Sequence, residues 1–244
     1  MARADPVGLV WVTGWPGTGK STCGDYLASC GFAHIDVDAD FMYPARGKGP
    51  VGGWRSSWMD FFAGKEPSTA EFGPFLKDVC ERVLELREAD AGQKIVITQS
   101  LHRPGRDYVR QQLGVVFFIG LTASDEKIAA RLMYKEQRYY SLMGQDLAAA
   151  FKARTGEELS KAAYLREFRG KASTRNAERA GLDTSDCEPN CNRIDVTVNE
   201  GAVLPRVRAL LGLPELASPI DATDAAEATW RKLAAAKPWE EGGE

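Results

Sequence analysis

The chain has 244 residues, enough for one sizeable α/β core with a lid or a small appendage, but hardly for two independent domains. Its 44% hydrophobic and 27% charged residues are ordinary for a globular protein, and a formal net charge of -3 gives no overall attraction to nucleic acid or a membrane. Any binding of anions must therefore be local. The cysteines number five, an odd count, and no secretion signal or spanning segment precedes them, so we expect a reduced, cytoplasmic setting.

Short β-rich apolar runs alternate with longer helical patterns along the chain. The predicted strands are Leu9–Thr13, His34–Asp38, Ile95–Thr98, Val115–Leu121 and Ile194–Val198. The predicted helices are Lys20–Ser29, Glu71–Ala89, Arg106–Leu113, Ser124–Lys135 and Val203–Leu211. Five buried strands alternating with helices indicate an α/β fold whose mostly parallel sheet is covered on both faces.

A glycine-rich motif follows the first predicted strand and opens the first predicted helix. It reads Gly14-Trp15-Pro16-Gly17-Thr18-Gly19-Lys20-Ser21, the G-x-x-x-x-G-K-S pattern of a phosphate-binding P-loop. Its backbone N-H groups and the helix N-terminus favour nucleotide phosphates, Lys20 is expected to reach the β- and γ-phosphates, and the Ser21 hydroxyl to join a magnesium shell. The alternative is a strand-to-helix turn that binds nothing. The expected nucleotide contacts are Gly14, Pro16, Gly17, Thr18, Gly19, Lys20, Ser21 and Thr22.

Three carboxylates stand at the end of the second predicted strand and just beyond it: Asp36, Asp38 and Asp40. If the strand continued, their spacing of two would place all three on one face, beside the P-loop at the ligand-binding edge of the sheet. They could hold magnesium through water or take a proton from an acceptor hydroxyl, although one of them could instead cap the next helix. For Asp36 both interpretations stand; for Asp38 and Asp40 we favour function.

Several segments resemble the small-molecule kinases of the gluconokinase and shikimate kinase group. Residues 38–44, Asp-Ala-Asp-Phe-Met-Tyr-Pro, look like the D-G-D-F-L-H-P stretch of gluconokinases, and residues 100–110 are similar to their A-L-K-x-x-Y-R-D-x-L-R segment. Arg131-Leu132 matches the R-L before their lid, and Arg55 with Trp58-Met59 matches R-x-P-W-L. The resemblance covers roughly residues 8–143 and returns at residues 194–211.

The resemblance implies a three-layer P-loop kinase fold with a five-stranded parallel sheet, a helical lid, ATP and Mg²⁺. It implies Asp40 as the contact or base for the acceptor hydroxyl and Asp38 near magnesium. The domain would span residues 1–213, with an acceptor-binding region at about 43–62 and a lid at about 134–191. Residues 214–244 would form a C-terminal helical extension that packs on the body or docks a partner.

The acceptor end departs from the gluconokinase pattern. Gly52-Gly53-Trp54 stands before Arg55 where gluconokinases have a D-D-D run. This departure favours a pocket that is more apolar, or one that recognises an anionic group through Arg55 and Arg106. Trp54 is the aromatic residue expected to line that pocket, although such residues more often belong to a core.

The candidate lid is rich in basic residues. Arg131, Lys135 and Arg138 are nearest to the lid arginines of the similar kinases and are expected to contact nucleotide, with Arg131 and Arg138 stabilising the transferred phosphoryl group. A second basic set lies farther on, and its interpretation as a solvated helix face is slightly favoured over phosphate binding. That set comprises Lys161, Arg166, Arg169, Lys171, Arg175 and Arg179.

The sequence therefore predicts transfer of the ATP γ-phosphate to a hydroxyl of a small polar metabolite, with a carbohydrate acid as the leading acceptor class. One alternative is a nucleoside, nucleotide or polynucleotide-end kinase, although the acidic charge balance disfavours nucleic acid. Another is a nucleotide-binding interaction protein without acceptor turnover. No membrane association is expected, a homodimer stays possible, and Cys187 and Cys191 could pair or clip a metal but lack the further ligands of a zinc site.

Overall fold

The computed structural model of the chain describes residues 8–38, 40, 69–101, 103–142, 144–172, 191–197 and 203–214. Within these ranges one parallel sheet runs in the order β2-β3-β1-β4-β5. Its strands are β1 (Leu9–Gly14), β2 (Ala33–Asp36), β3 (Ile95–Thr98), β4 (Phe117–Thr122) and β5 (Cys191–Asp195). All residues of β1 and β3 are buried, as expected of central parallel strands covered on both faces.

The strand β1 lies at the point where the order of the strands along the sheet reverses. After β1 the chain builds β2 and β3 on one side, then crosses to build β4 and β5 on the other. In open parallel sheets, ligands bind outside the carboxyl ends of the strands at such a point. The segment that follows β1 therefore occupies the ligand-binding edge of this sheet.

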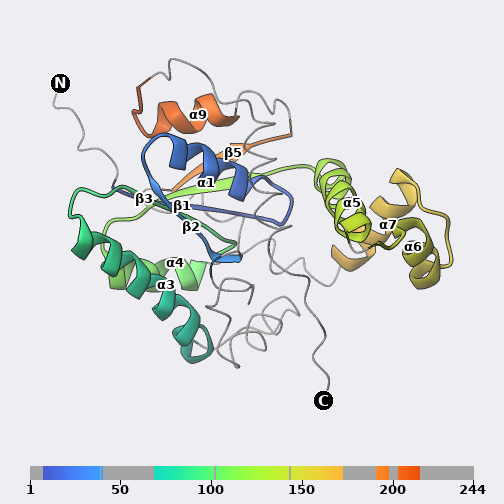
Figure 1. Ribbon diagram of the computed structural model, residues 1–244, viewed down its shortest axis with the longest axis horizontal. Coiled ribbons are helices and arrows are strands. Elements are labelled where there is room, and N and C mark those ends of the chain that lie inside the picture. The colour runs from blue at the N-terminus through green and yellow to red at the C-terminus, as the bar shows by residue number, and fades with distance from the viewer. Residues whose placement is uncertain are drawn as a thin grey trace.

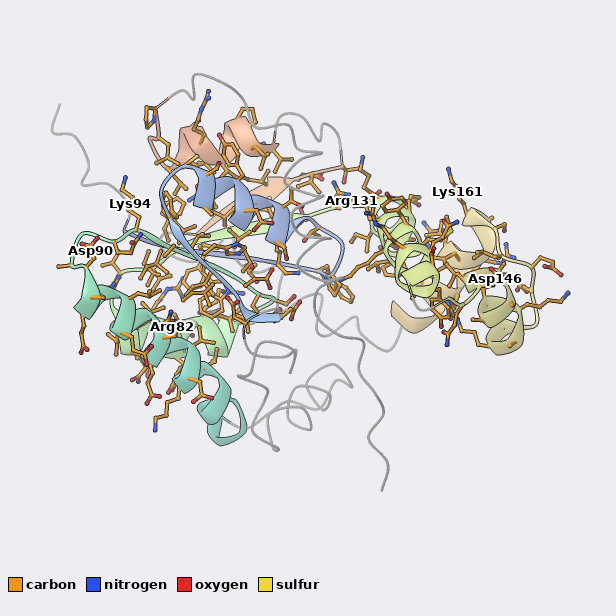
Figure 2. All side chains as sticks on the ribbon, in the orientation of Figure 1. Arg82, Asp90, Lys94, Arg131, Asp146 and Lys161 are labelled. Carbon is orange, nitrogen blue, oxygen red and sulfur yellow. The ribbon has the colours of Figure 1, made fainter. Side chains whose placement is uncertain are left out.

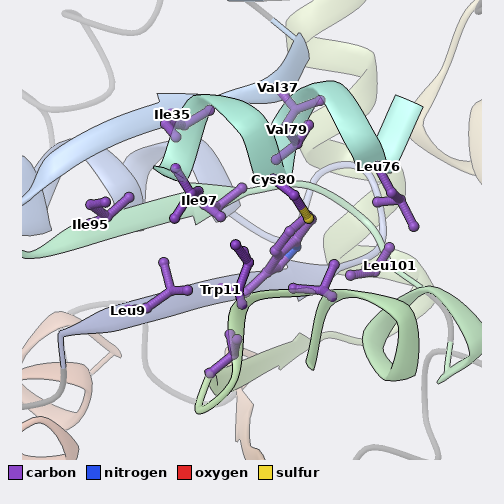
Figure 3. Packing of buried hydrophobic residues seen from close by; sticks show 14 of the residues in the cluster. Leu9, Trp11, Ile35, Val37, Leu76, Val79, Cys80, Ile95, Ile97 and Leu101 are labelled. Atoms are coloured by element: carbon purple, nitrogen blue, oxygen red, sulfur yellow. The ribbon is translucent and has the colours of Figure 1, made fainter. Parts of the chain in front are cut away.

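Helices cover both faces of the sheet (Figure 1). Leu9 and Trp11 of β1 belong to the core that includes Val79 of α3 (Thr69–Ala89), and Figure 3 shows this packing. The same core includes α4 (Arg103–Leu113) through its buried Val109. The intervening residues of β1 face the opposite way and pack with α1 (Lys20–Ser29) and α9 (Val203–Leu210). Alternation along one central strand thus creates two cores and three layers.

Three of the described helices form an insertion between β4 and β5, here called the helical insertion: α5 (Asp125–Leu142), α6 (Leu147–Thr155) and α7 (Lys161–Ala172). It lies to one side of the sheet in Figure 1 and has a small core of its own. In that core Phe151 of α6 stacks on Tyr164 of α7 with ring centroids 6.0 Å apart. Asp146 caps α6 by accepting a hydrogen bond from the N-H of Ala148.

The predicted α/β sheet is confirmed, and the differences lie at the ends of elements. The last strand was predicted at Ile194–Val198 but spans Cys191–Asp195, because an edge strand tolerates polar residues that weaken the apolar signal. The helix predicted at Ser124–Lys135 continues to Leu142, so the first residues of the predicted lid belong to α5. The predicted acceptor-binding region at 43–62 and the extension at 214–244 lie outside the described residues. No described helix is long and apolar enough to cross a membrane.

Candidate active site

The P-loop lies between β1 and α1, as the motif predicts. Gly14 ends the strand with a positive φ of 142°, and a Cβ there would lie 2.3 Å from the carbonyl oxygen of Leu121 in β4. Gly19 precedes the first turn of α1 with φ 96°, in the left-handed region that favours glycine. Two of the motif glycines are therefore required by the backbone path itself, before any ligand is considered.

Lys20 folds back over the loop that precedes it. Its Nζ donates hydrogen bonds to the carbonyl oxygens of Gly14 at 2.9 Å and Trp15 at 3.0 Å. Burial lowers the pKa of Lys20 to about 8, against the opposing attraction of Asp38. A negatively charged phosphate in the loop would favour the charged form of Lys20 and so raise its pKa. An anionic ligand would therefore stabilise this buried cation.

The remaining motif residues divide between supporting the loop and facing its surroundings. Thr18 is buried, and its Oγ1 donates to the Trp15 carbonyl at 2.7 Å, so this side chain stabilises the loop. Pro16, Ser21 and Thr22 are partly exposed at the turn and at the start of α1. Ser21 thus occupies the position at which the motif predicts a hydroxyl for magnesium.

The acidic run does not continue as a strand, so the prediction that the three carboxylates share one strand face is wrong. The strand β2 ends at Asp36, and the backbone is helical at Val37 and Asp38. Asp40 lies where its Oδ2 accepts a hydrogen bond from the Asp36 N-H at 3.0 Å. This bond gives the N-H of Asp36, the last residue of the edge strand β2, a partner from the turn that follows.

Asp38 lies in the electrostatic neighbourhood of the P-loop lysine. Burial and the neighbouring Asp36 raise the pKa of the Asp38 carboxyl, whereas Lys20 and a hydrogen bond from Gln99 act in the opposite direction. The Gln99 Nε2 donates to Asp38 Oδ1 at 2.6 Å. The structure therefore places a carboxylate that follows β2 near enough to Lys20 for each to influence the pKa of the other.

Gln99 and Ser100 are site residues that the sequence reasoning missed. Both follow β3 directly, both are 2% exposed, and the Ser100 Oγ donates to the Gly14 carbonyl at 2.7 Å. The available signal was a polar pair at the carboxyl end of a buried strand, the position at which such sheets bind ligands. A third connection at this strand end runs from the Leu101 N-H to Thr13 Oγ1 at 2.9 Å.

The helical insertion reaches the P-loop through α5. Arg131 donates to the Gly17 carbonyl at 3.0 Å, and Lys135, one turn later, lies near enough to influence the pKa values of both Lys20 and Asp38. Figure 2 shows Arg131 at the side of the insertion nearest the sheet, with Asp146 and Lys161 farther out. Arg138 is a further turn along, where its Nη1 donates to the Tyr134 hydroxyl at 3.3 Å.

An apolar contact accompanies these basic residues. Trp15 of the P-loop is 8% exposed and packs with Ile128 of α5, with Leu132 and Phe168 against the same cluster. The P-loop and the insertion are thus joined by both an apolar cluster and the hydrogen bond from Arg131.

Two residues of the second basic set form ion pairs within the insertion. Arg166 pairs with Glu157, and Arg169 pairs with Asp125 and Glu126 at the first turn of α5. These partners support the interpretation of an exposed, ion-paired helix surface. Lys161 is exposed, while Arg175 and Arg179 lie outside the described residues.

The predicted acceptor residues are only partly described. Arg106 of α4 is fully buried, and its Nη1 donates to the Leu101 carbonyl at 2.5 Å, which places it behind the end of β3. Trp54 and Arg55 lie outside the described residues. The roles predicted for all three toward an acceptor stay predictions.

The described residues fit a magnesium ion that arrives with a nucleotide. Mg²⁺ at phosphotransfer sites usually has one or two carboxylate ligands and completes its shell with phosphate oxygens and water. Asp38 beside Lys20 and the Ser21 hydroxyl are suitable donors. Among the described ranges no group of three or more His, Cys, Asp or Glu residues could hold a metal without such help.

Comparisons with known proteins support the fold. No protein-family model matches the sequence, and no curated protein does. A sugar kinase from Janibacter sp. HTCC2649 matches with a TM-score of 0.53 and 20% identity, over 85% of this chain and 96% of that chain. Further matches are a gluconokinase from Sinorhizobium meliloti 1021 (TM-score 0.48, 19% identity, 92% and 97% covered) and a shikimate kinase from Acinetobacter baumannii (0.43, 17%, 85% and 92%).

The fold is therefore that of the P-loop kinases: a five-stranded parallel sheet between helical layers. The predicted fold is confirmed by the match to the sugar kinase. A sequence identity of 20% shows the fold alone, so the reaction and the substrate are inferred from the site.

Proposed function

We propose that the protein is an ATP-dependent kinase that transfers the γ-phosphate to a hydroxyl group of a small polar metabolite. The observation that supports this most is the meeting of a P-loop lysine and a carboxylate at one end of the sheet. Lys20 and Asp38 come from different strand ends, and each influences the pKa of the other. Switch proteins and kinases both hold magnesium with such a carboxylate, and transfer to an alcohol also uses an acidic group for the acceptor, the role proposed for Asp40 at the same turn.

In this proposal the chain's residues divide the work by position. Lys20 binds the phosphates, Arg131 and Arg138 of α5 stabilise the transferred group, Lys135 contacts the nucleotide, and Asp40 orients or deprotonates the acceptor hydroxyl. Asp38 and Ser21 would hold magnesium, which supplies charge neutralisation between the β- and γ-phosphates when it is bound. The contact between Trp15 and the insertion would help to exclude water from the loop.

The acceptor class rests on the sequence resemblance. We favour a carbohydrate acid such as gluconate or a relative, with Arg55 and Arg106 as candidate partners for its carboxylate. A nucleoside or a polynucleotide end is the competing acceptor. An interaction protein that binds nucleotide without transfer is the competing function, and the helical insertion with its separate core would then be the docking element.

The test is an acceptor panel with purified protein and Mg-ATP. The panel contains sugar acids, polyols, nucleosides and oligonucleotides, and the readout is acceptor-dependent ADP release together with mass detection of the phosphorylated product. We expect turnover with at least one sugar acid. Nucleotide binding with no acceptor-dependent release across the panel would refute the kinase proposal and favour the interaction protein.

A variant tests the assigned base. Asp40→Asn keeps an oxygen that can accept the Asp36 N-H, so the turn after β2 should persist while the acidic group is lost. We expect turnover to fall by about 100-fold or more, the usual contribution of a general base, with ATP binding retained. Exposed Asp107, which pairs with Arg110 on the surface of α4, provides the matched control. Turnover in Asp40→Asn equal to that of Asp107→Asn would remove Asp40 from the mechanism.

A further inference from the structure

The amide of Gln99 is fixed between two partners of opposite polarity. Its Nε2 donates to Asp38 Oδ1 at 2.6 Å, and its Oε1 accepts from the backbone N-H of Ser100 at 2.7 Å. A flipped amide would place oxygen against the carboxylate and an NH₂ group against an N-H donor. Only one orientation of the amide satisfies both contacts.

The rest of Gln99 is held equally firmly. The side chain is 2% exposed, the residue's N-H donates to the Val12 carbonyl at 3.1 Å, and its own carbonyl accepts from Trp11 Nε1 at 3.0 Å. The two groups that bind the Gln99 backbone, the Val12 carbonyl and the Trp11 indole, belong to the central strand β1. The amide is therefore presented from a backbone that follows β3 directly and is bound to the central strand β1.

The position of the amide follows from the pairing of β2 with β3. Asp36 is the register partner of Thr98, so the two chains leave the sheet side by side. Gln99 directly follows Thr98, and Asp38 comes two residues after Asp36. One oxygen of Asp38 is bound by the amide, and the same carboxylate lies near enough to Lys20 to influence its pKa.

We propose that Gln99 is a positioning residue for the kinase reaction, which acts by orienting the Asp38 carboxylate toward the phosphate end of the site. The inference rests on the proposed function. With Oδ1 held by the amide, rotation of the carboxylate is restricted and Oδ2 is left for the ligand side. Without the amide, a buried carboxylate would be free to rotate toward Lys20 and pair with it in a geometry unsuited to magnesium or acceptor.

Two substitutions separate the two hydrogen bonds of the side chain. Gln99→Glu retains an oxygen for the Ser100 N-H but places a second carboxyl against Asp38, where the two either repel or share one proton; Gln99→Met has similar length and loses both hydrogen bonds. We expect kcat to fall at least tenfold in both variants, with the KM for ATP within threefold of the original value because the P-loop is untouched. Binding stoichiometry for a non-hydrolysable ATP analogue, measured by calorimetry, corrects kcat for the fraction of folded protein.

A double variant tests whether Gln99 acts through Asp38. If it does, adding Gln99→Met to Asp38→Asn should lower kcat by less than threefold beyond Asp38→Asn itself, because the group being oriented is already lost. Effects that multiply would show that Gln99 acts independently of Asp38 and would overturn the inference. Unchanged kcat in Gln99→Met would do the same.

Trp11→Phe is the matched control for general disturbance at this strand end. It removes the hydrogen bond from Trp11 Nε1 to the Gln99 carbonyl but leaves the amide in place. We expect a lower melting temperature with kcat per folded molecule within threefold of the original; a loss equal to that of Gln99→Met would overturn the inference. Absence of transfer in the original protein would refute the proposed function and this inference together. An unchanged kcat in the Gln99 variants, with transfer present in the original protein, would refute the inference only.

Discussion

Gly24 in the middle of α1 offers a stability test with an unusual expected sign. An alanine in a helix interior normally stabilises by about 1 kcal/mol relative to glycine. Here a Cβ would lie 2.2 Å from His34 Nε2 and 2.6 Å from Thr98 Cγ2. The His34 ring cannot easily move away, because it is held at 3.0 Å from both Asp25 Oδ1 and Thr98 Oγ1 and its side chain is 5% exposed.

The magnitude follows from three contributions. Overpacking a closely filled site costs about 1–3 kcal/mol, and displacing His34 from its two hydrogen bonds costs about 1 kcal/mol for each bond. The helix propensity of alanine offsets about 1 kcal/mol of this. We therefore expect Gly24→Ala to lower the free energy of unfolding by about 2–4 kcal/mol, and to loosen the attachment of the helix that carries Lys20.

Urea denaturation followed by circular dichroism measures the effect. Gly170→Ala in α7 is the control, because a Cβ there meets no atom within 4 Å, and it should stabilise by about 0.5–1 kcal/mol. The cost of Gly24→Ala should also shrink in a His34→Ala background, where part of the obstruction is gone. Stabilisation by Gly24→Ala equal to that by Gly170→Ala would refute the steric argument.

Three further predictions concern the P-loop, the insertion and the core. Arg131→Met should lower kcat/KM for ATP by about tenfold or more in steady-state assays, because it removes a charged group bound to the loop at the Gly17 carbonyl; an unchanged value would place Arg131 outside the nucleotide site. Trp15→Ala should lower the free energy of unfolding in urea by about 3 kcal/mol, since it empties the cluster between loop and insertion; a loss below about 1 kcal/mol would indicate that the cluster contributes little. Burial raises the pKa of Cys80 to about 11, so its thiol stays protonated at pH 8 and should resist iodoacetamide until urea unfolds the chain, as mass spectrometry of the labelled peptide would reveal; rapid labelling of the native protein would contradict its burial.

The sequence by itself determined the donor side of the site. The P-loop is a local object: its glycines, Lys20 and Ser21 are consecutive, and the flanking strand and helix were visible as apolar and amphipathic runs. Local signals also located the central strands, because strands buried on both faces must be largely apolar. They misplaced the ends of β5, where an edge strand includes Asn192 and Arg193, and the end of β2, where a helical turn replaces the expected alternation.

Tertiary structure decided which distant residues meet. Gln99 lies 61 residues from Asp38, and Arg131 lies 114 residues from Gly17. The first contact depends on the register of β2 against β3, and the second on the packing of α5 against Trp15. Neither the strand register nor the helix packing is encoded in a local pattern, because both depend on the free energy of the whole core. The sequence therefore supplied the phosphate-binding loop, and only the folded sheet placed Asp38, and the amide that holds it, near the lysine of that loop.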